Sequence, residues 1–103
     1  MNVDEYQLWA KSTAVYEHDF YPMASLMIEA AEFADLFAKP QLRGDDKTVP
    51  VREIISEAGD IMWNLANALH DMGITLSEVM EYNRDKIESR KQRGVIMGDG
   101  GDR

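Results

Sequence analysis

The chain contains no cysteine, and this absence excludes several chemistries at once. Without cysteine there is no disulfide, no zinc–thiolate centre and no thiol nucleophile. Basic residues are also scarce, because 11 Lys and Arg stand against 19 Asp and Glu and leave a net charge of −8. Binding of nucleic acid through a broadly basic surface is therefore not expected. An anionic small molecule would need cations between itself and the protein.

Long apolar runs are missing as well, since no stretch approaches the roughly 18 residues of a membrane span. The N-terminus opens with the acidic residues Asp4 and Glu5 and has no signal-peptide pattern. We therefore expect no membrane partner and a cytoplasmic location, which includes the cytoplasm of a host cell. A chain of 103 residues suffices for one domain and is too short for two, so residues 1–103 are predicted to form a single domain.

The apolar–polar alternation of strands is absent too, and helix signals divide the chain instead. These signals are capping boxes ahead of the first and fourth helices, a proline at the first turn of the second, and Pro40, before which that helix should stop. The predicted helices span residues 3–17, 22–38, 48–73 and 75–93. The predicted fold class is thus all-α, and the glycine-rich residues 94–103 are expected to form a flexible tail.

The third predicted helix carries the pattern around which the chain is organised. Polar side chains recur there at spacings of four and three, so they stack along one helical face. These residues are Glu53, Glu57, Asp60, Asn64, Asn67 and Asp71. No Lys or Arg accompanies the carboxylates, and like charges one turn apart repel each other. A divalent cation is the simplest source of the missing counter-charge.

A second carboxylate pair, Glu29 and Glu32, lies on the preceding helix among apolar and small residues. If the two helices pack antiparallel, this pair can converge with Glu57 and Asp60. Ligation by oxygen alone suggests Mg²⁺, with Mn²⁺ as the other candidate. A di-iron centre would need histidine three residues after glutamate, and neither histidine of this chain has that spacing.

The fourth predicted helix carries charge of the opposite sign. Asn83, Lys86 and Arg90 share one face, and Arg93 follows them. A basic last turn can simply complement the helix dipole. Three such residues on one face of an acidic protein favour phosphate binding instead. A metal held by carboxylates on one side and Lys or Arg on the other is the arrangement that phosphoryl chemistry needs.

Over roughly residues 20–103 these motifs resemble those of the MazG-like nucleoside triphosphate pyrophosphohydrolases. The matching features are the two carboxylate pairs on consecutive helices, Tyr21-Pro22 before the first pair, and the Asn-x-x-Lys-x-x-x-Arg segment. The resemblance implies a four-helix MazG-like bundle assembled as a homo-oligomer, either a homodimer or a dimer of dimers. It also implies Mg²⁺-dependent hydrolysis of a nucleoside triphosphate, a deoxynucleotide in our prediction, to monophosphate and pyrophosphate. That activity would cleanse the nucleotide pool.

The same resemblance implies roles for individual residues. The catalytic, metal-holding group would be Glu29, Glu32, Glu57 and Asp60, and the phosphate-binding group Asn83, Lys86, Arg90 and Arg93. Trp63 could stack on the nucleobase, although it is at least as well explained as a core residue. Asn64 and Asn67 stand where related chains often have apolar or aromatic residues, so we include them in the predicted nucleoside pocket.

Two other classes of function remain open from the sequence. The chain could be a non-catalytic metal-binding or regulatory helical oligomer that keeps the ligands without turnover. It could also be a pure interaction bundle whose acidic stripe faces solvent. Turnover of nucleotides separates the enzyme from both alternatives, and a metal titration separates the alternatives from each other.

Overall fold

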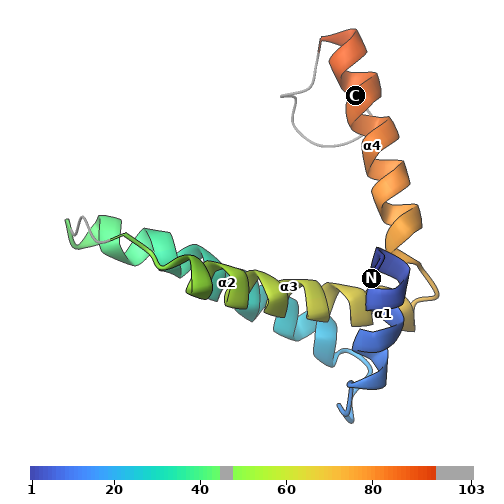
Figure 1. Ribbon diagram of the computed structural model, residues 1–103, viewed down its shortest axis with the longest axis horizontal. Helices are drawn as coiled ribbons and strands as arrows, with labels where there is room; N and C mark the ends of the chain where they lie inside the picture. The colour runs from blue at the N-terminus through green and yellow to red at the C-terminus, as the bar shows by residue number, and fades with distance from the viewer. Residues whose placement is uncertain (45–47, 95–103) are drawn as a thin grey trace.

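The computed structural model describes residues 1–44 and 48–94. These residues form four helices, α1 (Val3–Ser12), α2 (Tyr21–Leu42), α3 (Val51–Asp71) and α4 (Leu76–Arg93) (Figure 1). No strand occurs within these two ranges, so the predicted all-α class is confirmed. None of the helices described is long and apolar enough to cross a membrane. Except for Gly94, the predicted flexible tail lies outside the described residues.

The helix starts follow local signals. The side chain of Asn2 accepts a hydrogen bond from the backbone N–H of Glu5 and so caps α1. Thr75 and Glu78 form a complete capping box at the start of α4, where each side chain accepts from the other's backbone N–H. Such signals act within one turn, which is why they can be read without knowledge of the tertiary structure.

The predicted C-terminal ends of the first two helices are wrong. α1 ends at Ser12 because the hydroxyls of Ser12 and Thr13 donate to the carbonyls of Trp9 (2.5 Å) and Ala10 (2.7 Å), which competes with continued helix. α2 passes through Pro40 and reaches Leu42. Pro40 lies in the last turn, where its missing N–H removes only one backbone hydrogen bond. The other helix ends agree with the prediction within one turn.

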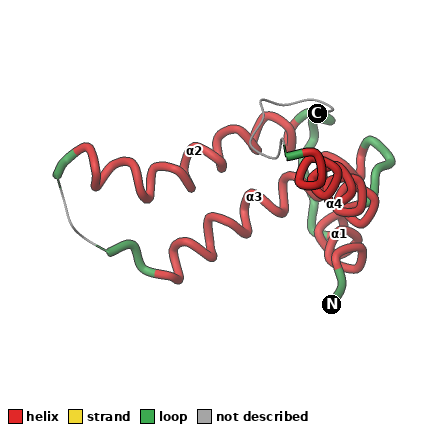
Figure 2. Tube along the Cα trace, turned by 90° about the horizontal axis from the view of Figure 1, so that it is seen from above, coloured by secondary structure: helices red, strands yellow, loops and turns green. Residues whose placement is uncertain are grey.

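The helices do not close into a bundle within one chain. α2 and α3 run antiparallel as a long arm, α1 packs across one end of α3, and α4 leads away from that corner (Figures 1 and 2). The radius of gyration is 16.6 Å, whereas a compact chain of about 100 residues has a value of about 13 Å. The single chain is therefore an open, angular structure.

Burial within one chain is unusual for so apolar a sequence. The buried apolar residues in the described ranges are Ala10, Pro22, Ala66 and Ala68, and none of them has a large side chain. Large apolar side chains stay exposed along the arm, among them Met27, Ile28, Phe37, Ile55, Met62 and Leu65. Exposed apolar surface on this scale marks an interaction site in a soluble protein. The outer faces of the arm are therefore uncovered in a single chain.

A buried glutamine joins α1 to the junction between α3 and α4. The amide Nε2 of Gln7 donates to the carbonyls of Ala66 (3.1 Å) and Ile74 (2.9 Å). Its Oε1 accepts from the backbone N–H of Leu76 at 3.0 Å. Gln7 is only 3% exposed, so these bonds satisfy a fully desolvated amide. They fix α1 beside the inner face of α3.

Candidate functional site

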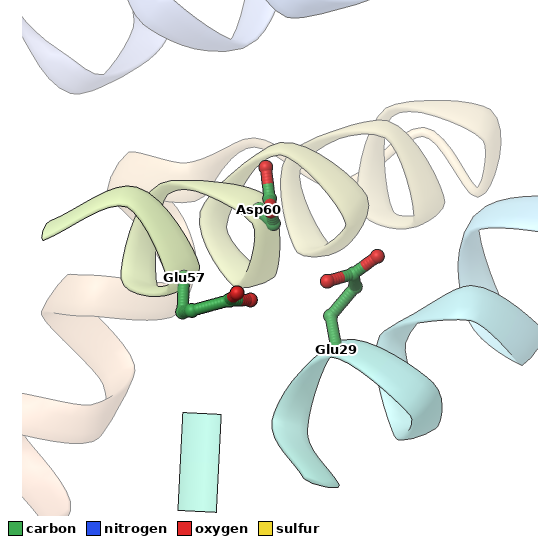
Figure 3. A group of neighbouring side chains, drawn as sticks. All are labelled: Glu29, Glu57 and Asp60. Atoms are coloured by element: carbon green, nitrogen blue, oxygen red, sulfur yellow. The ribbon is translucent and has the colours of Figure 1, made fainter. Parts of the chain in front are cut away.

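Three carboxylates converge near the middle of the arm. Glu29 extends from α2 and Glu57 from α3 toward each other, and Asp60 projects from α3 one turn beyond Glu57 (Figure 3). One oxygen atom from each lies within 4.8 Å of the other two. The three-residue spacing places Glu57 and Asp60 on one side of α3, and the antiparallel course of α2 brings Glu29 opposite them. This is the convergence that helix spacing predicts for an antiparallel pair.

The fourth predicted carboxylate, Glu32, lies one turn after Glu29 and is exposed. Its charge contributes to the raised pKa values of both Glu29 and Glu57. The four predicted residues therefore form one electrostatic group, although only three of them offer closely spaced oxygens.

The electrostatics of this group favour a bound cation. Desolvation by burial raises the pKa of Glu29 and of Glu57, and the neighbouring charges of Glu32 and Asp60 raise both further. The Oε2 atoms of Glu29 and Glu57 are buried and have no hydrogen-bond partner among the described residues. Orphaned acceptors in an all-oxygen donor set suit a hard divalent cation such as Mg²⁺ or Mn²⁺. The residues present thus fit the metal that the motif implies.

α1 contributes a phenol beside the carboxylates. Burial raises the pKa of Tyr6, and the charge of Asp60 raises it further. The Tyr6 hydroxyl therefore lies within the electrostatic reach of the Asp60 charge. Nothing in the carboxylate spacing indicates Tyr6, because its position depends on the packing of α1 across α3.

The polar stripe of α3 continues inward beyond the carboxylates. Asn64 and Asn67 are almost fully buried, and their amide groups donate to the carbonyls of Asp60 (2.8 Å) and Trp63 (3.1 Å). Their Oδ1 atoms have no partner within the described part of the chain. Trp63 is half-buried, and its indole N–H donates to the Thr13 hydroxyl at 2.8 Å. α3 therefore turns polar groups, and not only apolar ones, toward the other helices.

An aromatic cavity of about 360 Å³ opens next to this stripe. Its walls are Tyr16, Tyr21 and Trp63, with Val15, Glu17 and His18 completing the lining. The rings of Tyr16 and Tyr21 stack with centroids 5.7 Å apart, and Trp63 meets Tyr16 edge-on at 6.5 Å. Trp63 follows Asp60 by three residues, which is about 4.5 Å along the helix axis. One wall of the cavity is therefore within a helical turn of Asp60 along α3.

The predicted phosphate-binding residues lie on α4. Asn83 and Lys86 line a separate groove of about 660 Å³. Arg90 is buried, and the side chain of Arg93 donates to the carbonyl and hydroxyl of Ser89 at 3.2 Å. α4 packs mainly on α1 and leads away from the arm (Figure 1). Within one chain, these residues are therefore not brought to the carboxylates.

The fold and the site define an all-α protein with a group of converging carboxylates on a helical hairpin. Residues 21–95 match the family described as MazG nucleotide pyrophosphohydrolase domain, and the chain belongs to that family. It is also 36% identical to the "Gene 37 protein" of Mycobacterium phage L5, over 115 aligned positions that cover 100% of both chains. No solved structure matches. The family indicated by the sequence motifs is confirmed.

Proposed function

We propose that this protein hydrolyses a nucleoside triphosphate, with preference for a deoxynucleotide, to nucleoside monophosphate and pyrophosphate in the presence of Mg²⁺. The observation that carries the proposal is the group formed by Glu29, Glu57 and Asp60, whose oxygens lie within 4.8 Å of each other in a chain of the MazG family. Such an activity would remove unwanted nucleotides from the cellular pool.

Each carboxylate has a part in this reaction. Glu29, Glu57 and Asp60 hold the cation, with Glu32 beside them. Mg²⁺ held there would neutralise charge on the phosphates and would make the attacking water more acidic. One carboxylate of the group accepts the proton of the attacking water as general base. Water attacks the α-phosphorus, the bond between that phosphorus and the α–β bridging oxygen breaks, and pyrophosphate leaves.

The nucleoside is proposed to bind in the aromatic cavity. Its wall includes Trp63, close along α3 to the metal ligand Asp60, so a base there lies within reach of a triphosphate at the carboxylates. A flat aromatic lining suits stacking with any base. The Oδ1 atoms of Asn64 and Asn67 have no hydrogen-bond partner among the described residues. They could therefore accept a hydrogen bond from the nucleoside or from a bridging water.

The phosphates are proposed to meet Asn83, Lys86, Arg90 and Arg93 of a second copy of the chain. Two observations support this: α4 leads away from its own arm, and the arm exposes apolar faces on both helices. A homodimer or a dimer of dimers would cover these faces and could place the basic helix of one chain against the carboxylates of another.

The test is a panel of the common ribo- and deoxyribonucleoside triphosphates incubated with Mg²⁺, with pyrophosphate and orthophosphate measured separately. We expect pyrophosphate as the first product and full inhibition by a chelator. Release of orthophosphate first, or turnover that survives chelation, would contradict the proposal. A protein that binds Mn²⁺ and turns over no nucleotide would instead be a non-catalytic metal-binding oligomer.

A further inference from the structure

A network of charged hydrogen bonds connects the segment between α1 and α2 to the end of α3. The hydroxyl of Tyr16 donates to Oδ2 of Asp71 at 2.5 Å, and Nζ of Lys11 donates to Oδ1 at 2.8 Å. Lys11 also donates to the Tyr16 hydroxyl at 3.3 Å and lies 5.1 Å from the centre of its ring. We call these three residues the Asp71 clamp.

The clamp remains charged at neutral pH. Burial alone would raise the pKa of Asp71, but the hydrogen bonds from Lys11 and Tyr16 outweigh it, and the pKa is lowered. The hydrogen bond to Asp71 raises the pKa of Lys11. The side chains of Lys11 and Asp71 are 39% and 25% exposed, so water screens the pair only in part. The ionised carboxylate of Asp71, which accepts a directional hydrogen bond, thus holds the Tyr16 hydroxyl in place.

Tyr16 lines two cavities. One is the aromatic cavity, where its ring stacks on Tyr21 and meets the edge of Trp63. The other has a volume of about 480 Å³ and is also lined by Lys11 and Asp71. Tyr16 lies outside any helix, so backbone hydrogen bonding of a helix does not set the direction of its ring. The clamp supplies that direction from the hydroxyl end.

We propose that Lys11 and Asp71 are positioning residues that fix the Tyr16 ring as one wall of a nucleobase subsite. The inference rests on the proposed nucleotide hydrolysis and deepens it. A stacking platform helps binding only if its plane is held before the base arrives, because ordering a mobile ring on binding reduces affinity. Among the described residues, no hydrogen bond or ion pair joins the clamp to the carboxylate group or to α4. The clamp should therefore act on the base and not on the phosphates.

The kinetic test uses Tyr16→Phe, which keeps the ring and removes the hydroxyl, and Asp71→Asn, which removes the charge. Loss of a well-placed stacking surface should raise KM for the preferred triphosphate about tenfold, while kcat changes less than about twofold. Inorganic tripolyphosphate, which has no base, should inhibit wild type and variants with the same constant. Asp71→Glu, which keeps the charge, should recover part of the lost affinity.

The matched control is Asp85→Asn. Asp85 belongs to an exposed ion pair with Arg84 on α4, so this variant removes the same kind of group without altering the clamp. It should leave KM unchanged. Circular dichroism on every variant confirms that the helices are intact before kinetics are compared.

A binding test probes the aromatic cavity without turnover of a nucleotide. The chain has two tryptophans, so Trp9→Phe leaves Trp63 as the single fluorophore. A nucleoside monophosphate should quench Trp63, and Tyr16→Phe in the same background should raise its dissociation constant about tenfold.

The outcomes distinguish this inference from the function on which it rests. Wild-type turnover with unchanged KM in both clamp variants would overturn the inference alone. If the clamp variants weakened inhibition by tripolyphosphate as much as they weakened nucleotide binding, the inference would also be overturned. The clamp would then act on the phosphates or on the whole fold. Absence of pyrophosphate release by the wild type would overturn the proposed function itself.

Discussion

The Oε2 atoms of Glu29 and Glu57 are both buried on facing sides of the α2–α3 arm, and neither has a hydrogen-bond partner among the described residues (Figure 3). Two such acceptors with Asp60 and Glu32 nearby repel each other unless protons or a cation intervene. The site therefore carries unfavourable electrostatics in the metal-free protein that metal binding would relieve.

Asp60→Asn should separate binding of metal from folding. Removing one ligand should lower kcat/KM more than about a hundredfold, beyond the effect typical of residues that only support a ligand. The metal-free variant should melt at the wild-type temperature or above it, because one repelling charge is gone. Pyrophosphate release and thermal unfolding in a chelator measure the two effects. Asp35→Asn, an exposed acid on α2 paired with Lys39, is the control. A large loss of metal-free stability in Asp60→Asn would indicate a structural role.

The stability of the metal-free protein should fall as pH rises. The folded-state pKa values of Glu29 and Glu57 are raised above the ordinary 4.5, so the folded chain holds protons that the unfolded chain has released. Their contribution is fully present below pH 4.5 and is lost as pH rises through the raised values. The melting temperature in a chelator should accordingly decline across that window. The double variant Glu29→Gln/Glu57→Gln should lack this decline, and a flat wild-type profile would refute the argument.

Mg²⁺ should counteract the decline in melting temperature as pH rises. Protons and the cation compete for the same oxygens, so the increase in melting temperature caused by Mg²⁺ should grow with pH. The measurement is thermal unfolding with and without Mg²⁺ at several pH values. An increase that stays constant with pH would place the cation at other groups.

Gln7→Leu should destabilise the fold without touching the proposed catalytic group. The substitution leaves the carbonyl of Ile74 and the N–H of Leu76 without their partner, and each unsatisfied buried group costs about 1–3 kcal/mol. We expect the melting temperature to fall by roughly 10 °C or more. Gln41→Leu, at an exposed position near the end of α2, provides the matched change and should have little effect. Equal melting temperatures for the two variants would show that the Gln7 bonds are dispensable.

Lys86→Ala should weaken binding of the triphosphate more than binding of the nucleoside, because a lysine acts on phosphate as a point charge. A charge-assisted contact contributes about 1.5–3 kcal/mol, so kcat/KM should fall tenfold or more. Lys91→Ala removes the same charge from an exposed neighbouring position on α4 and should change kcat/KM little. Equal losses of affinity for triphosphate and nucleoside would exclude a contact between Lys86 and the phosphates.

The exposed apolar faces should drive self-association. Light scattering at micromolar concentration should give at least the mass of a dimer, and Ile55→Lys with Met62→Lys on α3 should shift the protein toward monomer. A monomer mass for the wild type would overturn the proposed assembly and, with it, the shared site formed by α4.

Local rules explain why much of the helix pattern could be predicted. The cap at Asn2 and the box at Thr75 act within one turn, and so does the spacing that puts Glu57 and Asp60 on one side of α3. The ends of α1 and α2 were mispredicted because competing local effects are close in energy. Side-chain hydroxyls shortened α1, and a proline in the last turn was tolerated.

By itself the sequence determined the order of the helices, the shared faces of the carboxylates and the family. Only the tertiary structure decided which faces are covered. α3 has both a polar and an apolar stripe, and its polar stripe is the one that buries Asn64 and Asn67. Periodicity cannot make that choice, because burial depends on which segments arrive from elsewhere in the chain. Tyr16 and Asp71 became partners in this way, and so did Gln7 and Leu76, through contacts that span 55 and 69 positions of sequence.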